Sequence, residues 1–167
     1  RLGKAKRHPK MTKAKRGGDP SDNVLILGAG AAGLAAAQTL REEGFEGPIT
    51  IISEESHLPY DRVKLSKVLS GEPKALRDEE WFEEHNIVIR HPAIAVGVDT
   101  EAHTVDVQSL SRKGSHQTFE YGKLLCATGG FARIFSEEQK EFHRGFSIPG
   151  TTLDGVFPVR VPEDSGA

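Results

Sequence analysis

The hydrophobic pattern of this chain begins with residues 24–27, a run of four apolar side chains with no polar residue among them. Such a run is typical of a parallel strand that is buried on both faces. Residues 31–43 are rich in alanine and leucine, and they predict a helix that stops at Gly44, a residue type common at helix ends. A second β-rich run follows at 49–52, so the chain opens with a predicted strand–helix–strand unit.

Shorter elements are predicted along the rest of the chain. Residues 77–85 favour a short helix that uses Trp81 and Phe82 as its apolar contacts. Four further stretches have strand character: 87–89, 93–98, 104–107 and 118–121. The last two alternate in character on either side of a polar loop, which is the pattern of an antiparallel hairpin.

A final buried strand is predicted at 123–128, where Cys126 is expected as a small buried thiol with no catalytic role. This strand ends in the turn Gly129–Gly130. Taken together, the elements predict an α/β fold with a parallel sheet and a small antiparallel β insert.

A G-x-G-x-x-G turn joins the first strand to the first helix. In such a turn Gly28 allows the tight bend, Gly30 has no Cβ to hold a pyrophosphate away, and Gly33 lets the helix lie close to the strand. The N–H groups that open the helix, at positions such as Ala31 and Ala32, together with the positive end of its dipole, form a natural seat for phosphate.

An acidic residue follows at the distance that a dinucleotide site requires. Glu54 lies 21 residues beyond Gly33 and directly after the second β-rich run. A carboxylate at this place accepts hydrogen bonds from the adenosine ribose. Because a strand, a helix and this acid surround the glycine turn, we favour a dinucleotide site over a helix start that merely tolerates glycines.

Composition narrows the class of protein. The 167 residues, 37% hydrophobic and 28% charged, suit one ordinary globular domain, and no run approaches the ~20 apolar residues of a membrane helix. Cys126 is the single cysteine, which excludes an internal disulfide and suits a reducing, intracellular compartment, cytoplasmic or mitochondrial. The seven histidines are scattered without metal-ligand spacing, so no metal site is expected.

The first 22 residues differ in charge from the rest of the chain. They hold eight Lys and Arg against two Asp, a net charge of +6, which leaves −8 for the remainder of a chain of net charge −2. We interpret residues 1–22 as a basic linker or tail, with a targeting sequence as the alternative. Nucleic-acid binding is not expected, because no aromatic residue is interleaved among the charges. The chain starts at Arg1 rather than at methionine, which indicates a fragment or a processed product.

Three motifs together resemble a known family. LILGAGAAG, SEESHLPYDRVKLSK and LLCATGG resemble the flavin domain of ferredoxin-reductase-type and apoptosis-inducing-factor-like flavoproteins, within the FAD-dependent pyridine nucleotide-disulfide oxidoreductase superfamily. The resemblance covers residues 23–163 and leaves 164–167 as a truncated end. It is strongest to members that carry an N-terminal Rieske iron–sulfur domain.

The resemblance implies a Rossmann-like FAD/NAD(P)-binding domain and a set of cofactor-binding residues. The glycine turn would bind the FAD pyrophosphate, Glu54 the adenosine ribose, and the backbone of Ala95 the adenine. Arg62 and Lys67 would contact the pyrophosphate–flavin side. The full set is Gly28, Gly30, Ala31, Ala32, Gly33, Glu54, Arg62, Lys67, Ala95, Thr128, Gly129 and Arg133. Val63 and Lys64 stand where many relatives have two prolines, which loosens the loop but removes no ligand group.

The implied function is an NAD(P)H-dependent flavoprotein oxidoreductase that passes electrons through FAD to an iron–sulfur acceptor or to an attached Rieske domain. Family members continue with a second nucleotide domain, so this piece is expected to carry an incomplete FAD site and to be inactive alone. A redox-disulfide enzyme of the glutathione-reductase type is excluded, because residues 54–80 hold no cysteine pair. A plain NAD-binding domain and a non-catalytic dinucleotide-binding fragment are the alternatives.

Overall fold

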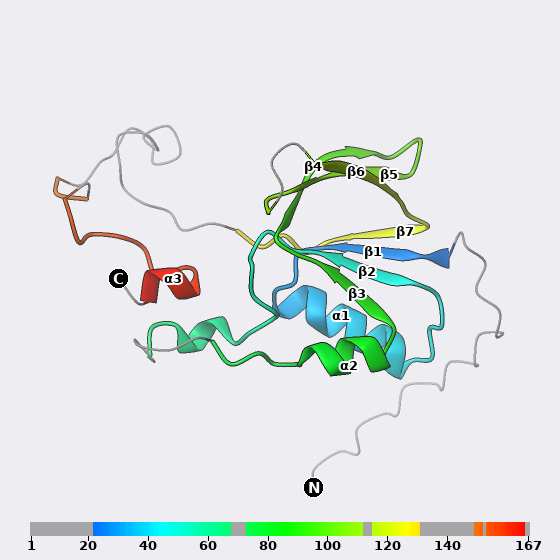
Figure 1. Cartoon of the computed structure of the whole chain (residues 1–167), viewed down its shortest axis with the longest axis horizontal. Helices are drawn as coiled ribbons and strands as arrows, with labels where there is room; N and C mark the ends of the chain where they lie inside the picture. Colours follow the sequence, from blue (N-terminus) through cyan, green and yellow to red (C-terminus); the bar gives the residue numbers. More distant parts are fainter. Residues whose placement is uncertain (1–21, 68–72, 112–114, 131–148, 152, 166–167) are drawn as a thin grey trace, which may run out of the picture.

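The computed structural model describes residues 22–67, 73–111, 115–130, 149–151 and 153–165. Three layers lie on one another (Figure 1): two helices, a parallel sheet and an antiparallel sheet. This arrangement confirms the predicted α/β fold, in which both faces of the parallel sheet are covered.

The parallel sheet has the strand order β3-β2-β1-β7. Its strands are β1 (Val24–Leu27), β2 (Ile49–Ile52), β3 (Ile87–Arg90) and β7 (Lys123–Cys126). Val24 lies opposite Ile49 on one side and opposite Lys123 on the other. The connections from β1 to β2 and β3 therefore run in one direction, while β7 is added on the opposite side of β1.

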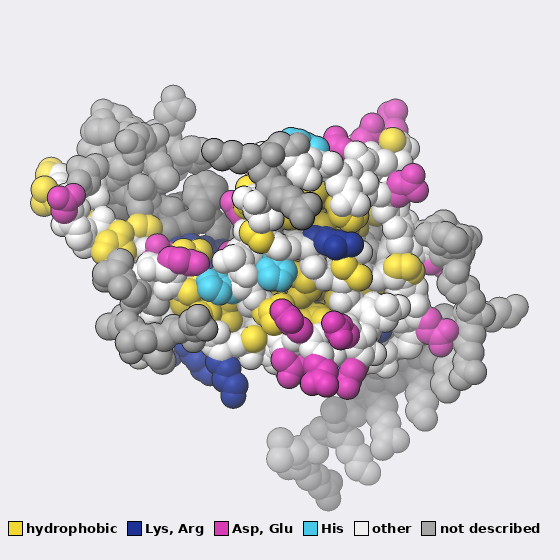
Figure 2. Space-filling view, in the orientation of Figure 1, with side chains coloured by type: hydrophobic (Ala, Val, Ile, Leu, Met, Phe, Trp, Pro, Cys, Tyr) yellow, Lys and Arg dark blue, Asp and Glu magenta, His cyan; other side chains and the backbone are white. Residues whose placement is uncertain are grey.

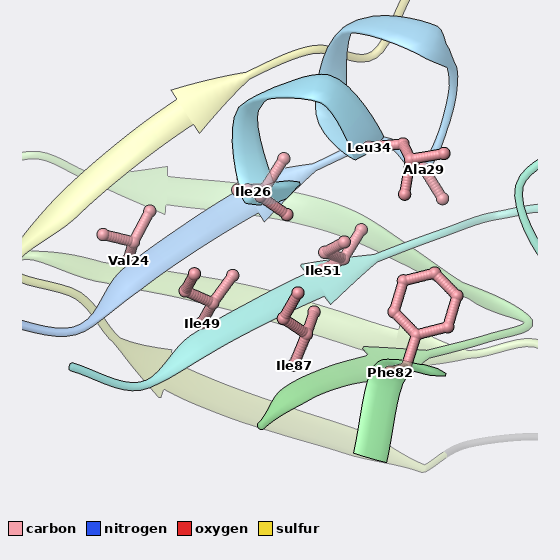
Figure 3. Close-up of a cluster of buried hydrophobic side chains, with 9 residues drawn as sticks. Val24, Ile26, Ala29, Leu34, Ile49, Ile51, Phe82 and Ile87 are labelled. Carbon is pink, nitrogen blue, oxygen red and sulfur yellow. The ribbon is translucent and has the colours of Figure 1, made fainter. Parts of the chain in front are cut away.

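Alternate side chains of β1 are buried on the two faces of the parallel sheet. Val24 and Ile26 pack with α1 (Ala31–Glu42) and α2 (Glu79–Glu84), in a cluster that also contains Phe82 (Figure 3). Leu25 and Leu27 pack on the other face, against the antiparallel sheet. Because successive strand residues point to opposite faces, burial on both faces explains why this strand is apolar throughout.

The antiparallel sheet contains β4 (Ala93–Asp99), β5 (Thr104–Ser109) and β6 (His116–Glu120) in the order β4-β5-β6. The β5–β6 pair confirms the predicted hairpin. The fourth predicted strand, β4, joins this hairpin and not the parallel sheet, with a bulge between Ala95 and Gly97. The insert is therefore one strand larger than the hairpin alone.

The helix bounds follow from local capping. The α1 helix begins after Gly30 and ends at Glu42, and Gly44 has a φ of +85°, as expected for a glycine beyond a helix end. Asp78 accepts a hydrogen bond from the N–H of Trp81 at 2.9 Å, so α2 starts two residues later than the predicted range. Two short turns complete the described secondary structure, a 3-10 helix at Arg62–Lys64 and α3 (Pro162–Ser165).

The outer face of α2 carries acidic side chains. Glu79, Glu80, Glu83 and Glu84 are exposed, and Figure 2 shows acidic side chains gathered over this helix. Phe82 is 4% exposed and is the buried anchor of the helix. None of the helices among the described residues is long and apolar enough to cross a membrane.

The prediction of a buried final strand is wrong. Along β7, Lys123, Leu125 and Cys126 are exposed, and Cys126 is a free thiol. Among the described strands β7 pairs only with β1, so it forms an edge of the described sheet. The apolar composition of this strand was therefore not sufficient to predict its burial.

Candidate dinucleotide-binding site

The glycine turn lies at the point where the strand order of the parallel sheet reverses. Residues after β1 and after β7 meet there: the N–H of Ala127 donates to the carbonyl of Leu27 at 2.8 Å. On the other side, the N–H of Gly28 donates to the carbonyl of Ile52 at 2.8 Å. In open α/β sheets, ligands bind at such a switch point, outside the carboxyl ends of the strands.

Packing within the protein explains two of the three glycines of the G-x-G-x-x-G turn. A Cβ on Gly28 would lie 2.3 Å from the carbonyl oxygen of Ala127, and the φ of Gly28 is +108°. A Cβ on Gly33 would lie 1.9 Å from the carbonyl oxygen of Gly28. These contacts confirm the predicted tight bend and the close approach of helix and strand.

Gly30 has no such explanation within the protein. Its φ of −67° and ψ of −172° are open to any residue, and no described atom lies within 4 Å of a Cβ built on it. The space in front of this position is therefore open. A ligand that approaches the backbone closely, such as a pyrophosphate, accounts for a glycine here.

The first turn of α1 is suited to an anion. Gly30 is the N-cap and has no side chain to bond the first N–H groups, and the residues that follow, Ala31, Ala32 and Gly33, have no side-chain polar atoms. Ala31 and Ala32 are exposed. The free N–H groups and the positive end of a 12-residue helix therefore face the open space at Gly30.

Glu54 lies on the same edge of the sheet as the glycine turn. It is exposed and follows Ser53, which is buried and directly follows the Ile52 that bonds Gly28. The side chain of Glu54 forms no hydrogen bond or ion pair with another described residue. The carboxylate of Glu54 is therefore unengaged among the described residues.

Ala95 lies in β4 of the antiparallel sheet. The N–H of Ala93 donates to the carbonyl of Ser53 at 2.7 Å, so β4 begins directly beside the end of β2. Ala95 is half-buried and packs on the cluster that contains Ile52. The structure thus brings Ala95 close to the segment that carries Glu54.

Arg62 lies in a network of three anchors. Its Nη2 donates to Oε1 of Glu55 at 2.5 Å, its Nη1 donates to the carbonyl of Arg160 at 2.5 Å, and its guanidinium lies 5.2 Å from the ring centroid of Tyr60. The hydroxyl of Tyr60 donates to Oε2 of Glu55 at 2.6 Å. Burial, and then this hydrogen bond, raise the pKa of Tyr60, so its hydroxyl stays a donor.

The remaining predicted residues differ in how far the structure places them. Thr128 and Gly129 are exposed directly after β7, and Gly129 has a φ of +70°. Lys67 is exposed at the end of a described stretch. Arg133 lies outside the described residues.

A segment near the end of the chain contacts this site, and no sequence pattern predicted this contact. The guanidinium of Arg160 bonds the carbonyl of Gly130, and its Nη2 lies 3.6 Å from a Cβ built on Gly129. Nε2 of His57 lies 2.8 Å from Oε1 of Glu163. The pKa of Glu163 is lowered by a backbone hydrogen bond and then by His57. The signal that could have pointed to this segment is the resemblance to the flavoprotein family, because Arg160 and Glu163 lie in the last part of the region that it covers.

Fold and site together define a dinucleotide-binding α/β domain, and comparison with known proteins gives the family. The model of the family described as "Pyridine nucleotide-disulphide oxidoreductase" matches residues 22–154. The chain belongs to this family, whose members bind FAD and use NAD(P)H.

Individual relatives are similar over most of this chain. Human "Apoptosis-inducing factor 3" is 40% identical over 147 residues, which is 87% of this chain and 22% of that protein. The ferredoxin reductase component of the chlorobenzene dioxygenase of Cupriavidus sp. (strain PS12) is 34% identical over 85% of this chain and 32% of its own length. The crystal structure of the ferredoxin reductase for the CYP199A2 system from Rhodopseudomonas palustris matches with a TM-score of 0.70 and 32% identity, covering 86% of this chain and 32% of that one. The chain thus spans about a fifth to a third of these relatives.

The family name refers to a disulfide, but the single Cys126 gives this chain no internal cysteine pair. Within the described part of the chain, no group of three or more His, Cys, Asp or Glu could hold a metal ion.

Proposed function

We propose that residues 23–163 are the FAD-binding domain of an NAD(P)H-dependent flavoprotein oxidoreductase. The observation that carries this proposal is Gly30, whose missing side chain is required neither by backbone geometry nor by packing among the described residues. The open space at Gly30 faces the first turn of α1, where an FAD diphosphate fits. Membership of the family supports FAD as the dinucleotide.

The proposed binding residues that the structure describes lie in the loops after the parallel strands and in the first turn of α1, with Ala95 in β4 of the insert. The glycine turn holds the diphosphate, Glu54 accepts hydrogen bonds from the ribose hydroxyls, and Arg62 and Lys67 supply positive charge on the flavin side. The backbone of Ala95 meets the adenine, and Thr128, Gly129 and Arg133 complete the site. Bound FAD supplies the step between the two-electron chemistry of NAD(P)H and one-electron transfer.

The electron acceptor that we propose is an iron–sulfur protein, either a separate ferredoxin or a Rieske domain of the same polypeptide. The names of the ferredoxin reductases among the relatives support the first, and the resemblance of the three sequence motifs to members with a Rieske domain supports the second. We also propose a reducing compartment, the cytoplasm or the mitochondrion, for which the single cysteine is the support.

Substitution of Gly30 tests the proposal directly. The Gly30→Ala variant is expected to fold normally, because its Cβ enters open space. The same Cβ obstructs a diphosphate at the helix start, so the affinity for FAD is expected to fall by about tenfold or more, equivalent to roughly 1.4 kcal/mol. Equilibrium dialysis of the purified chain against FAD measures the affinity, and circular dichroism verifies the fold.

A matched control adds the same methyl group elsewhere. In the Gly97→Ala variant the new Cβ lies 3.6 Å from a carboxylate oxygen of Asp106, an ordinary contact in the antiparallel sheet, and its FAD affinity is expected to stay unchanged. A folded Gly30→Ala variant that binds FAD as tightly as the wild type contradicts the proposal.

A further inference from the structure

Two consecutive glutamates follow β2, and their surroundings differ. The side chain of Glu54 is exposed and has no polar partner within the described stretches, whereas both carboxylate oxygens of Glu55 are engaged by neighbouring side chains. The side chain of Glu55 is 27% exposed. A carboxylate whose two oxygens are already engaged is poorly placed to bind a sugar, so Glu55 has another task.

We propose that Glu55 is a positioning residue that fixes the guanidinium of Arg62 for the FAD diphosphate, and that the hydroxyl of Tyr60 fixes Glu55 in turn. This inference rests on the proposed function, because it requires that Arg62 meets the diphosphate.

The contact between Glu55 and Arg62 is supported from behind by Tyr60. The side chain of Tyr60 is held in the protein, with the residue only 9% exposed, and its hydroxyl donates to Oε2 of Glu55 at 2.6 Å. The other oxygen, Oε1, accepts from Nη2 of Arg62 at 2.5 Å. The buried tyrosine thereby sets the position of the carboxylate, and the carboxylate sets the position of the guanidinium.

Arg62 is anchored from two further directions. Asp61 accepts a hydrogen bond from the N–H of Val63 at 3.1 Å and so begins the 3-10 helix that carries Arg62. Nη1 of Arg62 donates to the carbonyl of Arg160, and the guanidinium of Arg160 reaches the carbonyl of Gly130. Arg62 therefore links the loop after β2 to the segment after β7 before any ligand binds.

This anchoring leaves capacity for a ligand. A guanidinium has five N–H groups in a rigid fork, and the contacts to Glu55 and Arg160 use one N–H on each of two nitrogens. The remaining groups are held in a fixed direction. Because the side chain is ordered in advance, the binding of phosphate oxygens costs less conformational entropy.

A double-mutant cycle on FAD affinity tests the inference, with the purified chain and FAD as the probe. Glu55→Ala removes both contacts and is expected to weaken FAD binding by about tenfold, the size of one lost charge-assisted hydrogen bond. Arg62→Ala is expected to weaken binding at least as much. The double variant is expected to bind like Arg62→Ala alone, because Glu55 acts through Arg62.

Two conservative variants separate positioning from a general effect on the fold. Glu55→Gln keeps an oxygen that accepts from Arg62 and an amide that donates to the Tyr60 oxygen, so its FAD affinity is expected within about threefold of wild type. Tyr60→Phe removes only the hydroxyl and is expected to lose about twofold to threefold, with the Glu55–Arg62 contact retained. If Glu55→Ala does not fold, Tyr60→Phe still decides the question, because a folded Tyr60→Phe variant with the FAD affinity of the wild type overturns the positioning role.

The outcomes distinguish this inference from the proposed function. A wild-type chain that binds FAD together with a Glu55→Ala variant that binds equally well overturns the positioning role alone. The same holds if the losses of Glu55→Ala and Arg62→Ala add in the double variant, or if Glu55→Gln binds as weakly as Glu55→Ala. A folded Gly30→Ala variant that binds FAD as tightly as the wild type overturns the proposed function, and this inference with it.

Discussion

Arg41 in the last turn of α1 joins several segments through backbone carbonyls. Its Nε donates to the carbonyl of His85 at 2.6 Å and its Nη2 to that of Asn86 at 2.8 Å. Its Nη1 donates to the carbonyls of Phe45 and Gly47 at 2.6 and 2.9 Å. One side chain thus ties the end of α1 to the turn before β2 and to the end of α2. We predict that this guanidinium is a main contributor to the stability of the helical layer.

The substitution that isolates these hydrogen bonds is Arg41→Met, since methionine keeps an aliphatic stem and has nearly the same helix propensity as arginine. Burial lowers the pKa of Arg41, but a guanidinium stays charged at neutral pH, so charged hydrogen bonds are lost. Three of the four bonds are part-buried, to His85, Phe45 and Gly47. At about 1 kcal/mol net for each of these, the free energy of unfolding is expected to fall by about 3 kcal/mol.

Urea unfolding followed by circular dichroism measures this loss, with an unchanged dependence on urea concentration as evidence that the folded and unfolded states keep their compactness. Arg77→Met is the matched control. Among the described residues Arg77 makes one hydrogen bond, to the carbonyl of its neighbour Leu76, and its guanidinium lies 5.3 Å from the ring centroid of Trp81. The free energy of unfolding is therefore expected to fall by less than about 1 kcal/mol in Arg77→Met. If Arg41→Met costs no more than Arg77→Met, the reasoning is refuted.

Two further predictions concern the site and its neighbourhood. Gly33→Ala places a Cβ 1.9 Å from the carbonyl oxygen of Gly28, where backbone has to move, so the free energy of unfolding is expected to fall by about 3 kcal/mol or more; a loss below about 1 kcal/mol in urea unfolding contradicts this. Hydrogen bonds from the N–H groups of Val161 and Arg160 lower the pKa of Asp164. Its contribution is therefore present above the ordinary carboxyl pKa of 3.8 and is lost as the pH falls through the lowered value. After correction for intrinsic exchange rates, the protection of these two amides against hydrogen exchange is expected to decrease once the pH falls below the lowered pKa of Asp164, and equal protection above and below that pKa argues against it.

Local sequence was sufficient for the strand–helix–strand unit and for the glycine turn. A strand buried on both faces, β1, requires an unbroken apolar run, and the tight turn after it requires glycine at Gly28. Helix ends were predictable where a capping residue sets them, as Gly44 does for α1. These features depend on residues close together in the sequence, so they could be predicted from the sequence alone.

Features that depend on residues far apart in the sequence could not be predicted in this way. The contact between Arg62 and Arg160 joins positions 98 residues apart, and neither side chain belongs to a periodic pattern. The burial of Cys126 was predicted wrongly for the same reason, because an apolar strand is buried only if another element covers it. Glu54 and Glu55 look alike in sequence, and only the positions of Tyr60 and Arg62 show that Glu55 is engaged, whereas Glu54 has no polar partner among the described residues.

The structure assigns different reasons to the three glycines of the G-x-G-x-x-G turn. A G-x-G-x-x-G pattern treats its glycines alike, but Gly28 and Gly33 are required by atoms of the protein itself, at 2.3 and 1.9 Å from a built Cβ. Any fold with this turn needs them, whether or not it binds a nucleotide. Gly30 is different, because backbone and packing both permit a side chain there. Gly30 is therefore the glycine that favours a bound ligand. The FAD affinity of the Gly30→Ala variant shows whether this turn binds a nucleotide or only forms a tight bend.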